Sequence, residues 1–235
     1  CPAHKHGTRQ EAAAKLIQLA AQYQSPTPVT IWVCRRNQLE TLREFAPLVD
    51  RVCLNPFVHN SVRNTAIPEP PWANTDHTFL RQLQDIRLAA PGRQLVACLE
   101  FDGEEYRYGG RNPTFEEIQW FALAAIGSGF QGIAWRGDLD AMPYRQRLDR
   151  FVDNILRFAD ELARAKPVDW ATVAAPPHAD GAAPSAPPPH CSALLAENHL
   201  FIVLLHPRYV NVRQHRLEVP LPPDPGLATA VVEVH

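Results

Sequence analysis

A glutamate that closes an apolar run is the residue of this sequence best suited to chemistry. Residues 94–101 read QLVACLEF, and Glu100 comes directly before the polar stretch that contains Asp102. A carboxyl group at such a strand end is partly withdrawn from water, and neighbouring carboxylates add to the effect, which tunes it for nucleophilic or acid–base work. The alternative is a structural glutamate paired with an arginine such as Arg136. Asp102 could position a ligand or simply begin the Asp-Gly turn.

A second apolar run, residues 130–136 (FQGIAWR), ends in an aromatic residue and a cation. Trp135 could offer a flat surface on which a ring such as a sugar stacks, or it could pack in the core. Arg136 and Asp138 could hydrogen-bond ligand hydroxyl groups or form a structural pair. These three residues are therefore candidates for ligand binding.

Two earlier apolar runs also end in polar residues. Arg35 follows the run VTIWVC, and Asn55 and His59 lie at and beyond the end of RVCLNPF. Both Asn55 and His59 could donate to a ligand, although Asn-Pro is also a common end of a strand. We include all three residues in the candidate binding set.

Other chemistries lack the residues that they need. The 10 histidines do not occur in HExxH or another ligand spacing, so no metal site is expected. No serine lies in a G-x-S-x-G elbow, and there is no P-loop or glycine-rich dinucleotide fingerprint. The sequence therefore predicts no cofactor. Glu116 and Glu117 are most simply explained as helix-capping and solvated residues.

The elements that would position these residues alternate between strand and helix. Continuous apolar runs predict buried parallel strands, and capping-box spacings with an apolar face predict helices. The expected strands cover residues 29–34, 51–57, 94–101 and 130–135, and the expected helices cover residues 8–24, 37–48, 78–90, 114–126 and 146–165. A loop is expected over residues 59–75.

This alternation predicts the α/β class with a parallel sheet. Four βα units would make half of an eight-stranded barrel or a small doubly wound sheet. The half barrel is favoured because the dinucleotide fingerprint is missing and each strand ends in bulky polar residues. We therefore expect a partial (β/α)8 TIM barrel, in which the active site lies at the carboxyl ends of the strands.

The remainder of the chain predicts a linker and a small β-domain. Residues 173–190 are rich in Pro and Ala, a composition typical of linkers, and they separate a barrel half over residues 1–172 from a domain over residues 191–235. Short strands are expected there over residues 192–196, 200–205, 209–212, 217–220 and 230–234. This pattern favours a small antiparallel β-sandwich-like domain, which is expected to be incomplete in this sequence.

Composition limits the partners. With 46% hydrophobic and 20% charged residues, the 235-residue chain can form a sizeable core, and a formal charge of −2 offers no basic surface for nucleic acid. No apolar run approaches the length of about 18 residues that a membrane span needs. The five cysteines lack metal-type spacing, and those in apolar runs are expected to be small buried residues.

The order of these motifs resembles a known family. The chain resembles the C-terminal half of a β/α-barrel glycoside hydrolase of the β-galactosidase-like retaining superfamily. The resemblance rests on the order of a strand ending in Glu100, the sequence RNPTFEE opening a helix, the sequence GFQGIAW, a long helix and a linked β-domain. The resemblance covers roughly residues 8–170. It implies that the four strands are the fifth to eighth of the barrel, with Glu100 as the nucleophile and Trp135 as the aromatic residue of the last strand.

The same resemblance implies that part of the machinery is absent. Family enzymes carry the acid/base on the fourth strand, and this chain offers no such strand, so the N-terminal half of the barrel is expected to be missing and the isolated chain inactive. The expected ligand is an oligo- or polysaccharide, and secretion or a periplasmic location would suit it. The alternatives are a non-catalytic barrel that binds polysaccharide or protein through its β-module, and a complete small α/β domain of unknown chemistry.

Overall fold

The computed structural model describes residues 11, 15, 18–19, 22, 28–33, 39–55, 71–100, 114–137, 143–168, 190–196, 199–205, 215–218 and 231–234. Contacts divide the chain into two compact units, Cys1–Asp149 and Arg150–His235, and each is described by itself.

A four-stranded parallel sheet forms the first unit. Its strands pair in the order β1-β2-β3-β4, so each strand lies beside the one that precedes it in the sequence. The strands are β1 (Thr30–Val33), β2 (Arg51–Leu54), β3 (Gln94–Glu100) and β4 (Gly132–Arg136). The predicted parallel sheet and all four of its strands are confirmed, each within a few residues of the expected bounds.

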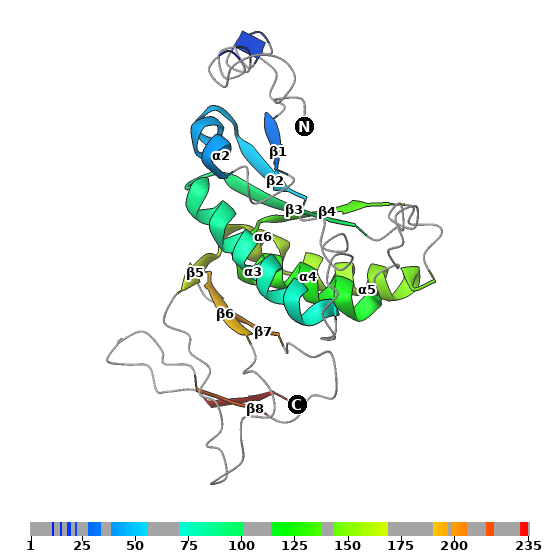
Figure 1. Ribbon diagram of the computed structural model, residues 1–235. Coiled ribbons are helices and arrows are strands. Elements are labelled where there is room, and N and C mark those ends of the chain that lie inside the picture. Colours follow the sequence, from blue (N-terminus) through cyan, green and yellow to red (C-terminus); the bar gives the residue numbers. More distant parts are fainter. Residues whose placement is uncertain are drawn as a thin grey trace, which may run out of the picture. The chain divides into compact units, whose positions relative to one another are not determined.

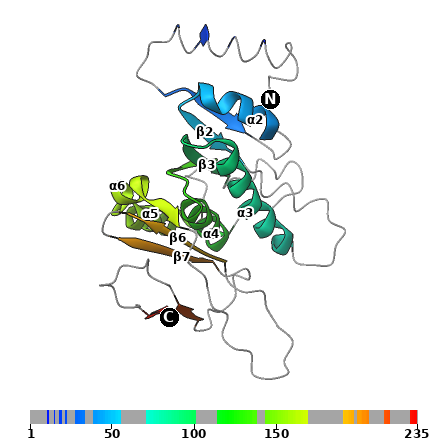
Figure 2. The same ribbon diagram turned by 90° about the vertical axis from the view of Figure 1, so that its left-hand side faces the viewer.

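Helices connect the strands and form a layer on the sheet. They are α2 (Leu39–Phe45), continued by the 3-10 turn η3 (Ala46–Leu48), α3 (Pro71–Ala89) and α4 (Phe115–Gly127). Helix α2 contacts α3, α3 contacts α4, and α4 packs on β3 and β4. Figures 1 and 2 show these three helices next to one another along the sheet.

The burial of alternate residues shows which face of the sheet lies under the helices. Successive strand residues point to opposite faces. On one face every described side chain of β2 and β3 is buried, namely Val52, Leu54, Leu95, Ala97 and Leu99. On the other face Trp32 of β1 is 53% exposed and Val96 is only half-buried, although Cys53 and Cys98 are buried there. The first face therefore packs against the helical layer.

Aromatic residues fill the contact between α3 and α4. The ring of Phe79 meets the ring of Phe121 edge-on at 4.9 Å between centroids, and Trp120 meets Phe121 edge-on at 5.3 Å. Leu83 and Ile118 are 0% and 1% exposed in the same two helices. Edge-to-face packing of this kind stabilises a helix pair beyond its apolar area alone.

Two helices differ from the sequence prediction. Helix α3 begins at Pro71, so the predicted loop is wrong over its last five residues, and proline suits the first position of a helix because no amide hydrogen is needed there. The predicted final helix is broken into α5 (Arg145–Leu156) and α6 (Ala159–Arg164). Phe158, between them, leaves helical geometry and packs edge-on against Phe201 at 5.8 Å, a tertiary contact that local periodicity does not encode.

The second unit holds an antiparallel sheet in the order β5-β6-β7. Its strands are β5 (Lys166–Val168), β6 (His190–Leu195) and β7 (Leu200–Leu205), and a separate antiparallel pair joins β8 (His215–Glu218) to β9 (Val231–Val234). The predicted small antiparallel region is confirmed. Strand β5, which precedes the Pro/Ala-rich stretch, was not predicted, and the strand predicted over residues 209–212 lies outside the described residues.

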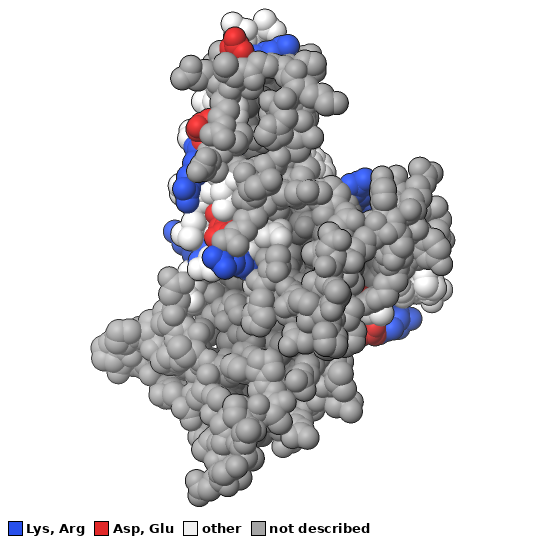
Figure 3. Space-filling view, in the orientation of Figure 1, with Lys and Arg blue, Asp and Glu red and all other residues white. Residues whose placement is uncertain are grey.

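Charged residues of both signs lie on the described surface, in keeping with the formal charge of −2. Figure 3 shows acidic and basic side chains of the described residues close to one another.

Cys53 and Cys98 are buried reduced thiols, as the sequence predicted for cysteines in apolar strands. Within the described ranges, no helix combines the length and the apolar character that a membrane crossing requires.

Candidate functional site

The carboxyl ends of the parallel strands bring two predicted residues together. Glu100 and Arg136 are the last residues of β3 and β4, and the pairing of these strands places them level with each other. The side chain of Glu100 lies outside the described part of the structure, whereas Arg136 is exposed. Because neighbouring strands lie about 4.8 Å apart, level residues on one face are neighbours. The glutamate and the arginine thus lie beside each other at the carboxyl ends of β3 and β4.

Strand alternation separates Trp135 from that pair. Trp135 is level with Leu99, which is 3% exposed on the face that packs against the helices. Arg136, one residue later, falls on the opposite face. Trp135 is half-buried. Of the two explanations open for Trp135, this register favours packing over a surface for ligand stacking.

Asn55 lies on the same face as Arg136, just past the end of β2. Its backbone N–H donates to the carbonyl oxygen of Val33 at 2.8 Å, which extends the pairing of β1 and β2 by one residue. Continuing the β2–β3 register makes Asn55 level with Cys98, two residues before Glu100. Asn55 is only 3% exposed. A buried amide must be hydrogen-bonded to be tolerated, so its orientation is fixed rather than free to vary.

Small side chains line this face below the edge. Cys98 is level with Ala134, and Val96 is level with Gly132. A Cβ atom added to Gly132 would come within 3.1 Å of Val96 Cγ2, so glycine allows the close approach of β4 to β3. The sheet is therefore closely packed directly beneath the level of Glu100 and Arg136.

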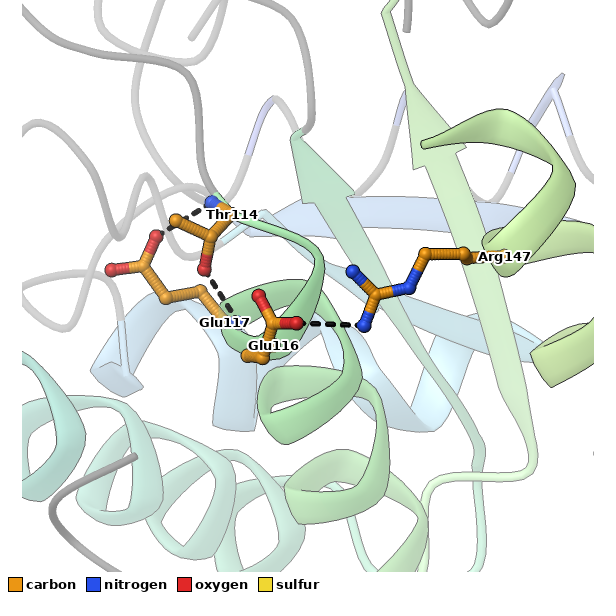
Figure 4. A network of polar contacts seen from close by, with 4 residues as sticks. All are labelled: Thr114, Glu116, Glu117 and Arg147. Atoms are coloured by element: carbon orange, nitrogen blue, oxygen red, sulfur yellow. Dashed lines mark hydrogen bonds and ion pairs between the residues drawn. The ribbon is translucent and has the colours of Figure 1, made fainter. Parts of the chain in front are cut away.

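The first turn of α4 also lies at this edge, because the helix runs back along the sheet after β3. Thr114 and Glu117 form a capping box, in which the Thr114 N–H donates to Glu117 Oε2 at 2.8 Å and the Glu117 N–H donates to Thr114 Oγ1 at 3.3 Å (Figure 4). The predicted cap is confirmed. Of the capping and solvated roles expected for Glu116 and Glu117, Glu117 has the capping role and is only 6% exposed. Burial is tolerated because the cap gives the carboxylate hydrogen-bond donors.

An ion pair joins the first turns of α4 and α5. Arg147 Nη2 lies 2.7 Å from Glu116 Oε1, as Figure 4 shows, and the Arg147 guanidinium lies 4.1 Å from the centre of the Phe115 ring. Hydrogen bonding to its own backbone N–H, and then to Arg147, lowers the pKa of Glu116 below its usual value. Both side chains are about half exposed, so the pair contributes little stability by itself.

Tyr144 is a polar residue of this region that the sequence did not single out. Its ring tilts toward Phe115 at 6.1 Å between centroids. Burial, followed by the charges of Glu117 and Glu116, raises the pKa of Tyr144 to about 12. No motif or spacing marks this tyrosine, and only its place before α5 could have suggested it.

Four predicted site residues fall outside the described residues. They are Arg35, His59, Asp102 and Asp138. Among the residues that the structure does describe, no three His, Cys, Asp or Glu side chains gather as a metal site would require. The part of the site that can be described is therefore a strand-end carboxylate position, a neighbouring guanidinium and a buried amide.

Comparisons with known protein families, with curated proteins and with solved structures found no match to this chain.

Proposed function

We propose that this chain is part of a retaining glycoside hydrolase built on a β/α barrel, and that Glu100 is its nucleophile. The observation that supports the proposal most is the placement of Glu100 at the carboxyl end of β3, level with Arg136 and on the side of the sheet that carries Asn55. Barrel enzymes assemble their chemistry from strand ends at this edge.

The strand order supports a barrel over a doubly wound sheet. Right-handed crossovers between strands in the order β1-β2-β3-β4 put every connecting helix on the same side. A doubly wound sheet instead reverses its strand order at a switch point and carries helices on both faces. The contacts of α2 with α3 and of α3 with α4 are those of a single helical layer. We extend this to a partial (β/α)8 barrel, with the antiparallel strands of the second unit belonging to a β-sandwich-like module.

In this proposal Glu100 attacks the anomeric carbon of a sugar and forms a covalent glycosyl-enzyme, which water then hydrolyses. Arg136 and Asn55 are the described candidates for contacts with sugar hydroxyl groups. Arg35, His59, Asp102 and Asp138 remain candidates on sequence grounds. Since the register favours packing for Trp135, we leave the stacking surface unassigned.

A retaining mechanism needs a second carboxyl about 5 Å from the nucleophile. The two described carboxylates near the carboxyl ends of the strands have other roles than that of the acid/base. Glu116 pairs with Arg147, and Glu117 accepts the backbone N–H of Thr114 in the capping box. We propose that the acid/base comes from a strand that this chain does not contain. The chain alone would then bind but not hydrolyse its substrate.

The test is covalent trapping in the full-length protein. An activated fluorinated glycoside, which forms a slow glycosyl-enzyme, is expected to label Glu100, and digestion with mass spectrometry locates the label. Glu100→Gln is expected to abolish labelling, whereas Glu116→Gln, a matched change at an exposed carboxylate of the same edge, should leave it intact. Labelling at another residue would refute the role of Glu100. Binding of oligosaccharide without labelling or hydrolysis would favour the non-catalytic barrel.

A further inference from the structure

We propose that Arg136 is a positioning residue that holds the carboxyl of Glu100 in its ionised form at the edge of the sheet. The inference deepens the role proposed for Glu100, but the electrostatic pair that it proposes does not depend on the protein being an enzyme.

The register of β3 and β4 makes the two residues neighbours. Four consecutive levels of the pairing, from Ala97 with Ile133 to Glu100 with Arg136, lead to the edge without a break. Level residues of a sheet share a face, so the backbone presents position 100 and position 136 side by side. A shift of register by one residue would put Arg136 level with a residue of the opposite face, and the buried side chains of Ala97 and Leu99 disfavour such a shift.

Uncharged residues occupy the described strand positions around this pair. Asn55 just past β2, Cys98 on β3 and Ala134 on β4 lie on the same face, at the level two residues before Glu100 and Arg136. The other arginine of this face, Arg51, lies at the opposite edge, where its Nε donates to Gln94 Oε1 at 2.7 Å. Arg136 is therefore the cation that the described strands place closest to Glu100.

The described cations in the first turn of α5 have acidic partners of their own, since Arg145 lies 3.7 Å from Asp149. Arg147 is committed to Glu116 at 2.7 Å. The carboxylate of Glu117 accepts the backbone N–H of Thr114. Both acids would repel a charged Glu100 at longer range and would favour its protonation. A neighbouring cation opposes that effect, which is why the role falls to Arg136.

The expected effect has a known size. An opposite charge within about 4–6 Å lowers a carboxyl pKa by about 1–3 units. Arg136 is exposed, so solvent screening places the expected value at the lower end of that range. A carboxyl that acts as a nucleophile must be ionised, and Arg136 would maintain this state over the physiological pH range.

The inference is tested by NMR titration of the Glu100 carboxyl carbon in the full chain, with the signal assigned through Glu100→Gln. Replacing Arg136 with Gln is expected to raise the Glu100 pKa by about 1 unit or more, and replacing it with Lys should keep the pKa within a few tenths of the original value. Arg43→Gln is the matched control. It removes the same charge from the last turn of α2, at the far edge of the sheet, and should leave Glu100 unchanged.

The inference would be overturned if Arg136→Gln changes the pKa of Glu100 no more than the control Arg43→Gln does. If Arg136→Gln does not fold, the inference is tested instead by following the NMR signal of Arg136 Nε in the unchanged protein as the pH is varied. The chemical shift of Arg136 Nε is expected to change with pH at the same midpoint as that of the Glu100 carboxyl carbon. An Nε chemical shift that does not change over the pH range in which Glu100 titrates would refute the pair. Because no step of this experiment needs catalysis, its failure is distinct from a failure of glycoside trapping.

Discussion

At the level of single residues, ionisable groups gather where α4 and α5 begin, and their environments differ. Glu116 is half exposed and pairs with Arg147, whereas Glu117 is buried in the capping box. Burial, followed by the charges of the two nearby carboxylates, raises the pKa of the half-buried Tyr144. The neutral phenol is therefore the form that the folded state prefers.

This preference predicts how stability depends on alkaline pH. The pKa of Tyr144 rises from 10.0, its ordinary value, to about 12 in the folded chain. The folded state holds the phenolic proton more tightly, so this stabilisation is complete below pH 10 and is lost as the pH rises from 10 toward 12. Urea unfolding across this window should show a free energy of unfolding that falls with pH, and Tyr144→Phe should flatten the decline.

Absorbance of tyrosinate provides the independent check. Tyr144→Phe is expected to remove the tyrosine that ionises near pH 12. If the variant instead loses a tyrosine that ionises near pH 10, the environment assigned to Tyr144 is wrong.

At the level of elements, the register of β3 and β4 determines which residues meet at the candidate site. A side chain stabilises the start of this pairing. Gln131 donates its backbone N–H to the carbonyl oxygen of Leu95 at 2.9 Å, and its Oε1 accepts the Leu95 N–H at 2.8 Å. One residue thus satisfies both backbone groups of Leu95.

Replacing Gln131 with Leu is predicted to destabilise this strand pair. The Leu95 N–H would lose its acceptor in a part-buried position, which costs about 1–3 kcal/mol. Urea unfolding measures the loss, and the Leu95 amide hydrogen should exchange faster. Gln131→Glu, which keeps an acceptor oxygen, is the matched control. Unchanged exchange at Leu95 in the Leu variant would contradict the prediction.

At the level of the whole molecule, residues from both sides of the Pro/Ala-rich stretch build the second unit. Strand β5 pairs with β6 across that stretch, through Val168 level with Ala193. Helix α6 adds an ion pair from Glu161 to His199 at 2.5 Å, and Phe158 packs edge-on against Phe201. The composition-based linker therefore connects parts of one packed unit.

This organisation predicts the result of cutting the chain. A protease site inserted after Gly181 should allow cleavage within the Pro/Ala-rich stretch, yet the two fragments are expected to co-elute in size-exclusion chromatography because α6 and β5 remain bound to β6 and β7. Adding Phe158→Ala to the same protein should weaken this association, since the variant removes the edge-on contact between the rings of Phe158 and Phe201. Separation of the fragments without that change would contradict the packing described here.

Local pattern accounts for much of the fold and for less of the site. Apolar runs located all four parallel strands, and the spacing of Thr114 and Glu117 located the start of α4, because strand burial and helix capping are properties of neighbouring residues. The break at Phe158 and the existence of β5 depend on partners that are distant in the sequence, Phe201 and strand β6, which local periodicity does not encode.

The sequence by itself determined that Glu100 ends a buried parallel strand and that polar residues follow its neighbours. Only the tertiary structure decided which of these residues meet. Strand register placed Arg136 level with Glu100, and alternation turned Trp135 toward the helices, although the two residues are adjacent in the sequence. The physical reason is that a sheet has two faces with a period of two residues, so the neighbours of a strand residue depend on pairing between strands.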